Sequence, residues 1–103
     1  MDDGIVEAPV LIEVADGFIL FFSSGCYTTT DYTVSYATCT SVSGPYTRQG
    51  GLLMNGDYGL NGPGGADVSG FGGVYHMLFH AHVGSNRELY TGLLNINGLK
   101  VSV

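Results

Sequence analysis

Glycine-containing turns divide the sequence into short segments of β-strand composition, and this division limits the chain to an all-β fold. Seventeen glycines and seven tyrosines, together with many Val, Thr and Ser residues, are typical of short strands joined by turns. No window combines a helical apolar period with capping residues. The sequence predicts strands over residues 10–15, 18–23, 32–38, 52–54, 66–69, 74–83, 88–94 and 100–103.

The two halves of the chain repeat one pattern. Ala8-Pro9-Val10, a glycine turn and the segment 19–22 correspond to Ala66-Asp67-Val68, a glycine turn and the segment 76–79. Each half therefore predicts a four-stranded antiparallel meander, which is the sheet that a β-propeller repeats around its axis. A ring needs at least about four such sheets. We therefore predict a single domain, residues 1–103, built as a partial β-propeller of about two blades over 5–58 and 59–103.

Strand alternation predicts that several polar residues share one rim of these blades. Because successive strands run in opposite directions, the start of the first strand and the loops 24–31 and 56–65 lie at the same end. In the second blade this rim receives His80, His82 and the loop 84–87. Glu7 precedes the first strand, so we expect it on the same rim.

The charge balance excludes a polyanionic partner. Nine acidic residues stand against three basic ones, a net charge of −6, whereas binding to a phosphate backbone or an anionic membrane surface needs clustered cations. The longest apolar run, 18–22, is far shorter than the ~20 residues of a membrane-spanning helix. No signal peptide is visible at the start of this chain.

Two cysteines are predicted to remain thiols. If the strands 18–23 and 33–38 pair as a hairpin, Cys26 lies in the connecting loop and Cys39 at the far end of the returning strand. At about 3.3 Å per residue, this separation exceeds the reach of a disulfide. The absence of a Cys-x-x-Cys pair also argues against a metal site built on cysteine.

Motifs along the whole chain resemble glycoside hydrolase family 43. The motifs are Gly4-Ile5-Val6-Glu7-Ala8-Pro9-Val10-Leu11-Ile12, Tyr32-Thr33-Val34-Ser35-Tyr36-Ala37-Thr38, Gly44-Pro45-Tyr46, Gly62-Pro63-Gly64-Gly65-Ala66-Asp67-Val68, Phe79-His80-Ala81-His82 and Leu89-Tyr90-Thr91. They follow the order and spacing of the family. The resemblance implies the last two blades of a five-bladed propeller that hydrolyses arabinan- and xylan-type glycosides with inversion of configuration.

The resemblance also implies a role for Glu7. The family's general acid is the Glu of a Glu-Ala-Pro or similar motif, which Glu7-Ala8-Pro9 matches, so Glu7 would protonate the departing glycosidic oxygen. A general acid must hold its proton near neutral pH, and apolar neighbours such as Ile5, Val6 and Val10 would favour the protonated form. From the residues alone, the favoured reading of Glu7 is a solvated rim residue beside an edge strand.

The resemblance leaves the catalytic pair incomplete. Inversion needs a second carboxylate as base, about 6.5–9.5 Å from the acid, and the family supplies that base and an acid-orienting Asp from earlier blades. Only Asp2 and Asp3 precede Glu7, without the family's surrounding motif. Whether this chain is an enzyme therefore stays open, and we expect little or no hydrolysis by it alone. The alternative is a non-catalytic carbohydrate-binding or self-assembling propeller fragment.

Four further residues are candidates for contact with sugar: His80, Arg87, Tyr27 and Tyr32. Aromatic faces and bidentate donors suit sugar rings and hydroxyls, although tyrosines and histidines in such sheets also serve as packing residues. His80 and His82 share one strand face and could chelate a metal. Many family members place a His after the Gly-Pro-Gly turn, near a central ion, where this chain has Gly65 and Ala66. We therefore expect no metal and no cofactor, although the resemblance allows a central calcium or other ion.

The expected partners follow from the same resemblance. It implies a plant cell-wall oligo- or polysaccharide as ligand and an extracellular location, with no nucleic acid or membrane as partner. Two blades alone would expose the apolar faces that neighbouring blades cover. We therefore also predict self-association through the exposed blade faces.

Overall fold

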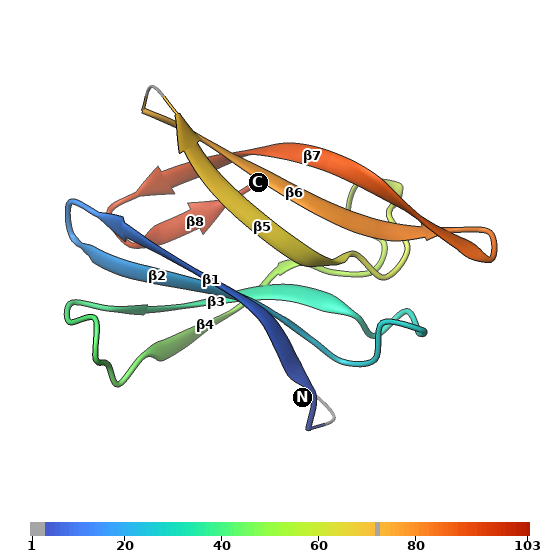
Figure 1. The fold of residues 1–103 in the computed structure, drawn as a ribbon, viewed down its shortest axis with the longest axis horizontal. Coiled ribbons are helices and arrows are strands. Elements are labelled where there is room, and N and C mark those ends of the chain that lie inside the picture. The colour runs from blue at the N-terminus through green and yellow to red at the C-terminus, as the bar shows by residue number, and fades with distance from the viewer. Residues whose placement is uncertain (1–3, 72) are drawn as a thin grey trace.

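The computed structural model describes residues 4–71 and 73–103 and is all-β, as predicted (Figure 1). The elements in chain order are β1 (Val6–Val14), β2 (Gly17–Ser24), β3 (Thr33–Cys39), β4 (Thr47–Leu53), the short 3₁₀ turn η1 (Asp57–Gly59), β5 (Gly64–Phe71), β6 (Val74–Val83), β7 (Asn86–Asn97) and β8 (Lys100–Ser102). Asp2, Asp3 and Gly72 lie outside the described residues. In the described part of the chain, no helix has the length and apolar character needed to cross a membrane.

The strands form two antiparallel four-stranded sheets, in the orders β1-β2-β3-β4 and β5-β6-β7-β8. This pair of meanders confirms the blade architecture predicted from the repeat. The sheets lie face to face, and the β2–β3, β4–β5 and β6–β7 connections lie toward the same end of the molecule (Figure 1). That end is the rim on which the sequence placed the candidate site.

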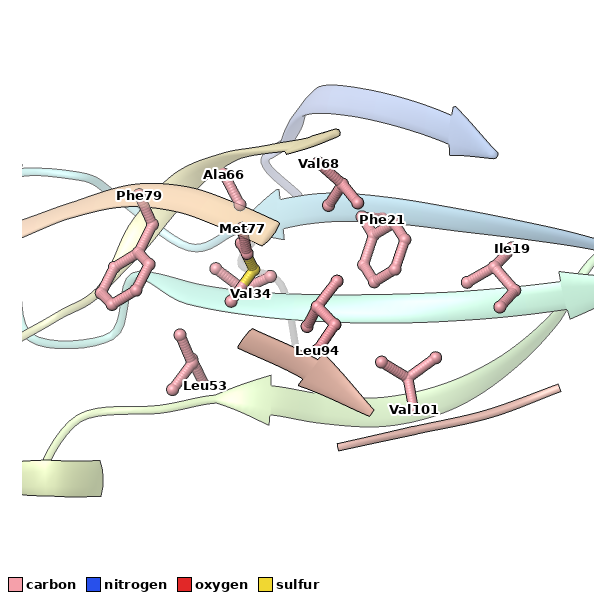
Figure 2. Close-up of a cluster of buried hydrophobic side chains, with 10 residues drawn as sticks. All are labelled: Ile19, Phe21, Val34, Leu53, Ala66, Val68, Met77, Phe79, Leu94 and Val101. Atoms are coloured by element: carbon pink, nitrogen blue, oxygen red, sulfur yellow. The ribbon is translucent and has the colours of Figure 1, made fainter. Parts of the chain in front are cut away.

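An apolar core between the two sheets holds them together. The first sheet contributes alternate residues of its strands, so that each inward side chain meets the opposite sheet (Figure 2). The buried cluster comprises Ile19, Phe21, Val34, Leu53, Ala66, Val68, Met77, Phe79, Leu94 and Val101. Phe21 and Met77 are both fully buried, one on each sheet, so truncating either would leave a void between the sheets.

Two hydrogen bonds cross the same interface. The Gly65 amide donates to the Ser23 hydroxyl oxygen at 2.7 Å, and the Val101 amide donates to the Tyr36 hydroxyl oxygen at 3.2 Å. Ser23 is fully buried, and a polar group removed from water needs such a partner. The bond from Gly65 therefore fixes the rim end of β5 against β2.

β1 and β4 begin several residues before their predicted starts. β1 begins at Val6 because an irregularity between Glu7 and Val10 lets it continue past Pro9 along β2. At this irregularity Ala8 has a φ of 54°, a left-handed conformation that is uncommon for alanine. β4 covers 47–53, including Gly50 and Gly51; glycines have low strand propensity, and here pairing with β3 overrides it.

The two cysteines lie at opposite ends of the first sheet. Cys39 pairs with Phe18 at one end of β2, whereas Cys26 follows the other end, where Ser24 pairs with Thr33. Both residues are thiols in the structure. The separation is the one that the hairpin argument predicted.

We predict that Phe21→Ala lowers the free energy of unfolding by about 3–5 kcal/mol, because it leaves a cavity between the sheets. Leu11→Ala is the control: Leu11 is 47% exposed on β1, so its truncation should cost less than about 1 kcal/mol. Urea denaturation followed by circular dichroism measures both. Equal losses in the two variants would contradict the assignment of this core.

Candidate functional site

An open cavity of about 490 Å³ lies at the rim where the two sheets meet. Its lining residues are Glu7, Tyr27, Tyr32, His80, Arg87, Glu88 and Leu89. The structure thus brings together all five site residues named from the sequence. Their chemical roles stay predictions.

Both sheets contribute to the cavity. Glu7 lies at the start of β1, opposite Ser23 of β2, and Tyr32 immediately precedes β3. His80 is near the end of β6, and Arg87 follows the β6–β7 turn at the start of β7. Because the rim ends of these strands converge, residues distant in the sequence become neighbours.

A hydrogen bond connects Glu7 to the first sheet. The Tyr32 hydroxyl donates to Oε2 of Glu7 at 2.9 Å. Glu7 itself is exposed, and Ile5 and Val6 are 38% and 60% exposed. The predicted apolar enclosure of the carboxyl by its sequence neighbours is therefore wrong for this chain, because β1 is an edge strand whose first residues extend past the core.

Tyr32 is held firmly in place. Its side chain is only 1% exposed, and its ring stacks on the His80 imidazole with centroids 6.0 Å apart and planes inclined at 26°. A side chain at Gly64 would collide with this ring. Burial raises the pKa of the Tyr32 hydroxyl, and the hydrogen bond to Glu7 raises it further.

The Arg87 guanidinium connects three backbone segments of the rim. It donates to the backbone oxygens of Gly62 at 2.7 Å, His80 at 2.9 Å and Tyr27 at 3.0 Å. Its Cζ atom also lies 5.3 Å from the centroid of the Tyr32 ring, in a cation–π contact. Four of its neighbours are thereby fixed relative to one another, so much of its donor capacity is used inside the protein.

His80 has a defined tautomer. Arg87 Nε donates to His80 Nδ1, so the neutral imidazole carries its hydrogen on Nε2. Burial lowers the pKa of His80 below 6.5, and the positive charge of Arg87 lowers it further. The imidazole is therefore neutral at pH 7. Its Nε2 lies over Gly65, and a side chain at position 65 would collide with the imidazole.

A metal site does not form among the described histidines, cysteines and carboxylates, since no three of them come together. His80 Nδ1 already accepts the bond from Arg87. Nε2 of His82 is buried without a hydrogen-bond partner, and the His82 amide donates to the Asn61 carbonyl oxygen at 2.9 Å. His82 thus lies beside the β4–β5 connection.

Sequence reasoning missed two lining residues, Glu88 and Leu89. Leu89 pairs directly with His80 across β6 and β7, and Glu88 brings a second carboxylate to the cavity. Both lie at the start of a strand predicted from residue 88, at its rim end. The predicted strand therefore indicated the rim position of both residues, but the exact register of β6 on β7 was needed to place them in the cavity.

Comparison with known proteins yields structural neighbours only: no family model matches the sequence, and no curated protein matches it. A thermostable family-43 glycoside hydrolase superposes with a TM-score of 0.83 over 94% of this chain and 34% of its own, at 23% identity. An endo-1,4-beta-xylanase from Bacteroides thetaiotaomicron gives 0.83 over 95% and 37%, at 26% identity. An alpha-L-arabinanase from Cellvibrio cellulosa gives 0.75 over 90% and 34%, at 25% identity.

The chain spans about a third of the length of these neighbours. It matches them over almost its whole length, so both sheets, and not one alone, have the neighbours' arrangement. Two blades out of a larger propeller account for this coverage.

We predict that folding stability falls as the pH drops below 6.5, because the unfolded chain then binds a proton at His80 that the folded chain resists. The loss continues down to the lowered pKa of the folded state. Urea midpoints at pH 7.5 and 5.5 measure it, with His80→Gln expected to reduce the difference. His76→Gln, at an exposed position of the same strand, should leave it unchanged; equal behaviour of the two variants would contradict the prediction.

Proposed function

We propose that this chain is the acid-bearing part of a hydrolase-like protein acting on arabinan- or xylan-type hemicellulose. The resemblance to glycoside hydrolase family 43 and the structural neighbours support this proposal. The single observation that carries the proposal is the position of Glu7. It lies in an open cavity between two blades, bonded to a buried tyrosine. In its acid form, Glu7 would protonate the glycosidic oxygen as the bond to the anomeric carbon breaks.

The remaining cavity residues have the chemistry of a sugar site. Tyr27 is 55% exposed and offers an aromatic face to the apolar side of a sugar ring. The neutral His80 can donate a hydrogen bond from Nε2 to a hydroxyl oxygen. Glu88 can accept hydrogen bonds from sugar hydroxyls. A polysaccharide partner would also agree with the extracellular location that the resemblance implies, which stays a prediction.

The base that activates water is proposed to come from blades outside this chain. The neighbours are about three times as long, and the resemblance assigns the base to an earlier blade. Glu88 is the one other carboxylate among the described lining residues of the cavity, so it is the alternative to test.

A small anionic nucleophile can test the acid without the base. Azide needs no deprotonation, so its attack on the anomeric carbon forms the C–N bond while Glu7 transfers its proton to the leaving oxygen. With phenyl α-L-arabinofuranoside or phenyl β-D-xyloside, whose leaving groups need protonation, we predict turnover near background in water and measurable glycosyl azide with azide. Glu7→Gln should lower the azide rate by at least about 100-fold.

Glu88→Gln is the matched control for that assay, because it removes a carboxylate from the same cavity. It should keep the azide reaction. Hydrolysis in water that disappears in Glu88→Gln would identify Glu88 as the base. Equal rates in the original chain and Glu7→Gln would contradict Glu7 as the acid.

Sugar binding is predicted independently of turnover. Replacing Tyr27 with Ala removes an exposed aromatic face, so affinity for arabino- or xylo-oligosaccharides should fall about 2- to 10-fold, the range expected for one stacking contact. Tyr58→Ala is the control, because Tyr58 is 76% exposed and does not line this cavity. Titration calorimetry measures both, and equal affinities would contradict a sugar contact at Tyr27.

An exposed apolar face favours self-assembly as a second candidate function. In the β6–β7 register, Leu78 pairs with Thr91, and His76 pairs with Leu93. Side chains directly opposite in antiparallel strands share a face, so these residues lie on the face of the second sheet that points away from the core. Leu78 and Leu93 are 44% and 58% exposed. A second copy of this chain would cover them in the way that a neighbouring blade would.

We predict an oligomer at micromolar concentrations by size-exclusion chromatography with light scattering. Leu93→Asn should shift the population toward monomer, because it places a polar group in the buried contact. Val42→Asn is the control: Val42 is 57% exposed but lies between β3 and β4, away from this face. A monomer at all concentrations would contradict the assembly.

A further inference from the structure

We propose that Tyr32 is a positioning residue for the acid, in place of the sugar-contacting residue that the sequence suggested; the inference rests on the proposed function of Glu7. The Tyr32 hydroxyl donates to Oε2 of Glu7 at 2.9 Å. This bond connects an exposed side chain on an edge strand to a residue that is only 1% exposed. The acid therefore takes its orientation from the first sheet through Tyr32.

The burial of Tyr32 argues against direct contact with sugar. Three groups pack against its ring: the His80 imidazole, the Arg87 guanidinium and the backbone at Gly64. A stacking platform needs an open aromatic face, which Tyr27 has and Tyr32 lacks. What Tyr32 presents toward Glu7 is its hydroxyl group.

These same contacts fix the direction in which the hydroxyl points. A tyrosine side chain has two rotatable bonds before the ring, and both are restrained when the ring is clamped between neighbours. Arg87 is itself anchored on three backbone oxygens. The clamping groups lie on β5, β6 and β7 of the second sheet, whereas Tyr32 immediately precedes β3 of the first. The orientation of Glu7 therefore depends on the two blades packing together.

The hydrogen bond also distinguishes the two oxygens of Glu7. Because Oε2 accepts from Tyr32, the acid form carries its proton on Oε1. In the transfer, the Oε1–H bond breaks, a new O–H bond forms on the departing glycosidic oxygen, and Glu7 is left as a carboxylate. The Tyr32 hydrogen bond to Oε2 persists and stabilises this anion. Water attacks the anomeric carbon and gives its proton to the carboxylate base of another blade.

Tyr32→Phe tests the positioning, because it removes the hydroxyl and keeps the buried ring. In the chain labelled with ¹³C-glutamate, the side-chain carboxyl resonance of Glu7 should shift at pH 7, and its side-chain order should fall. Glu13 and Glu88 serve as internal references. Tyr46→Phe is the matched control, because the Tyr46 hydroxyl donates to the Val42 carbonyl oxygen at 2.9 Å, away from the cavity.

A purely structural role for Tyr32 would alter stability without moving the Glu7 resonance selectively. A Glu7 resonance that moves no more than those of Glu13 and Glu88 would therefore overturn the proposal. The measurement needs no substrate. If arabino- and xylo-oligosaccharides fail to bind but Glu7 responds to Tyr32→Phe, the proposed function fails while the positioning stands.

The reciprocal variant does not depend on the folding of Tyr32→Phe. Glu7 is exposed, so Glu7→Gln should keep the fold, and it removes the negative charge that raises the pKa of Tyr32. The midpoint of the Tyr32 ¹³Cζ resonance in a pH titration should therefore move downward, whereas that of Tyr46 should stay in place. An unchanged Tyr32 midpoint would show that the two side chains are not coupled.

Discussion

The packing of one four-stranded sheet against the other is the constraint on which the rest of the structure depends. Phe21 and Met77 are fully buried in that interface. The site is built from both sides of it, with Glu7 and Tyr32 on the first sheet and His80 on the second. Neither sheet alone contains the cavity. Loss of the apolar contact would therefore remove the site together with the fold.

At the rim, polar and aromatic contacts continue the packing where the apolar core ends. The Tyr32 ring lies against His80 and beneath Arg87. The guanidinium is held over the ring by a hydrogen bond to the backbone oxygen of Gly62. The neutral state of His80 belongs to this arrangement, because a proton on Nδ1 would displace the bond from Arg87. Glu7 lies on the solvent side, attached through one hydrogen bond from the Tyr32 hydroxyl. A buried, rigid support thus carries an accessible carboxyl group, which is the combination that the proposed proton transfer to a bound substrate would require.

Much of the fold and of the site could be predicted because both follow from strand direction. Alternating strands place every second connection at one rim, so the sequence alone predicts that Glu7, Tyr27 and His80 lie together. The environment of Glu7 was predicted less well: Ile5 and Val6 are apolar in sequence but exposed in space. Glu88 was missed because a strand start has no recognisable motif, and its place depends on the pairing of β7 with β6.

The sequence by itself determined the all-β class, the two repeated meanders, the shared rim and the match of Glu7-Ala8-Pro9 to the acid motif of family 43. These properties are local: they depend on strand propensity, turn residues and the order of segments. Only the tertiary structure decided that Tyr32 is buried and bonded to Glu7, and that Arg87 fixes the tautomer of His80. Such contacts join residues far apart in the chain, and their geometry follows from how two twisted sheets pack, which no local pattern specifies.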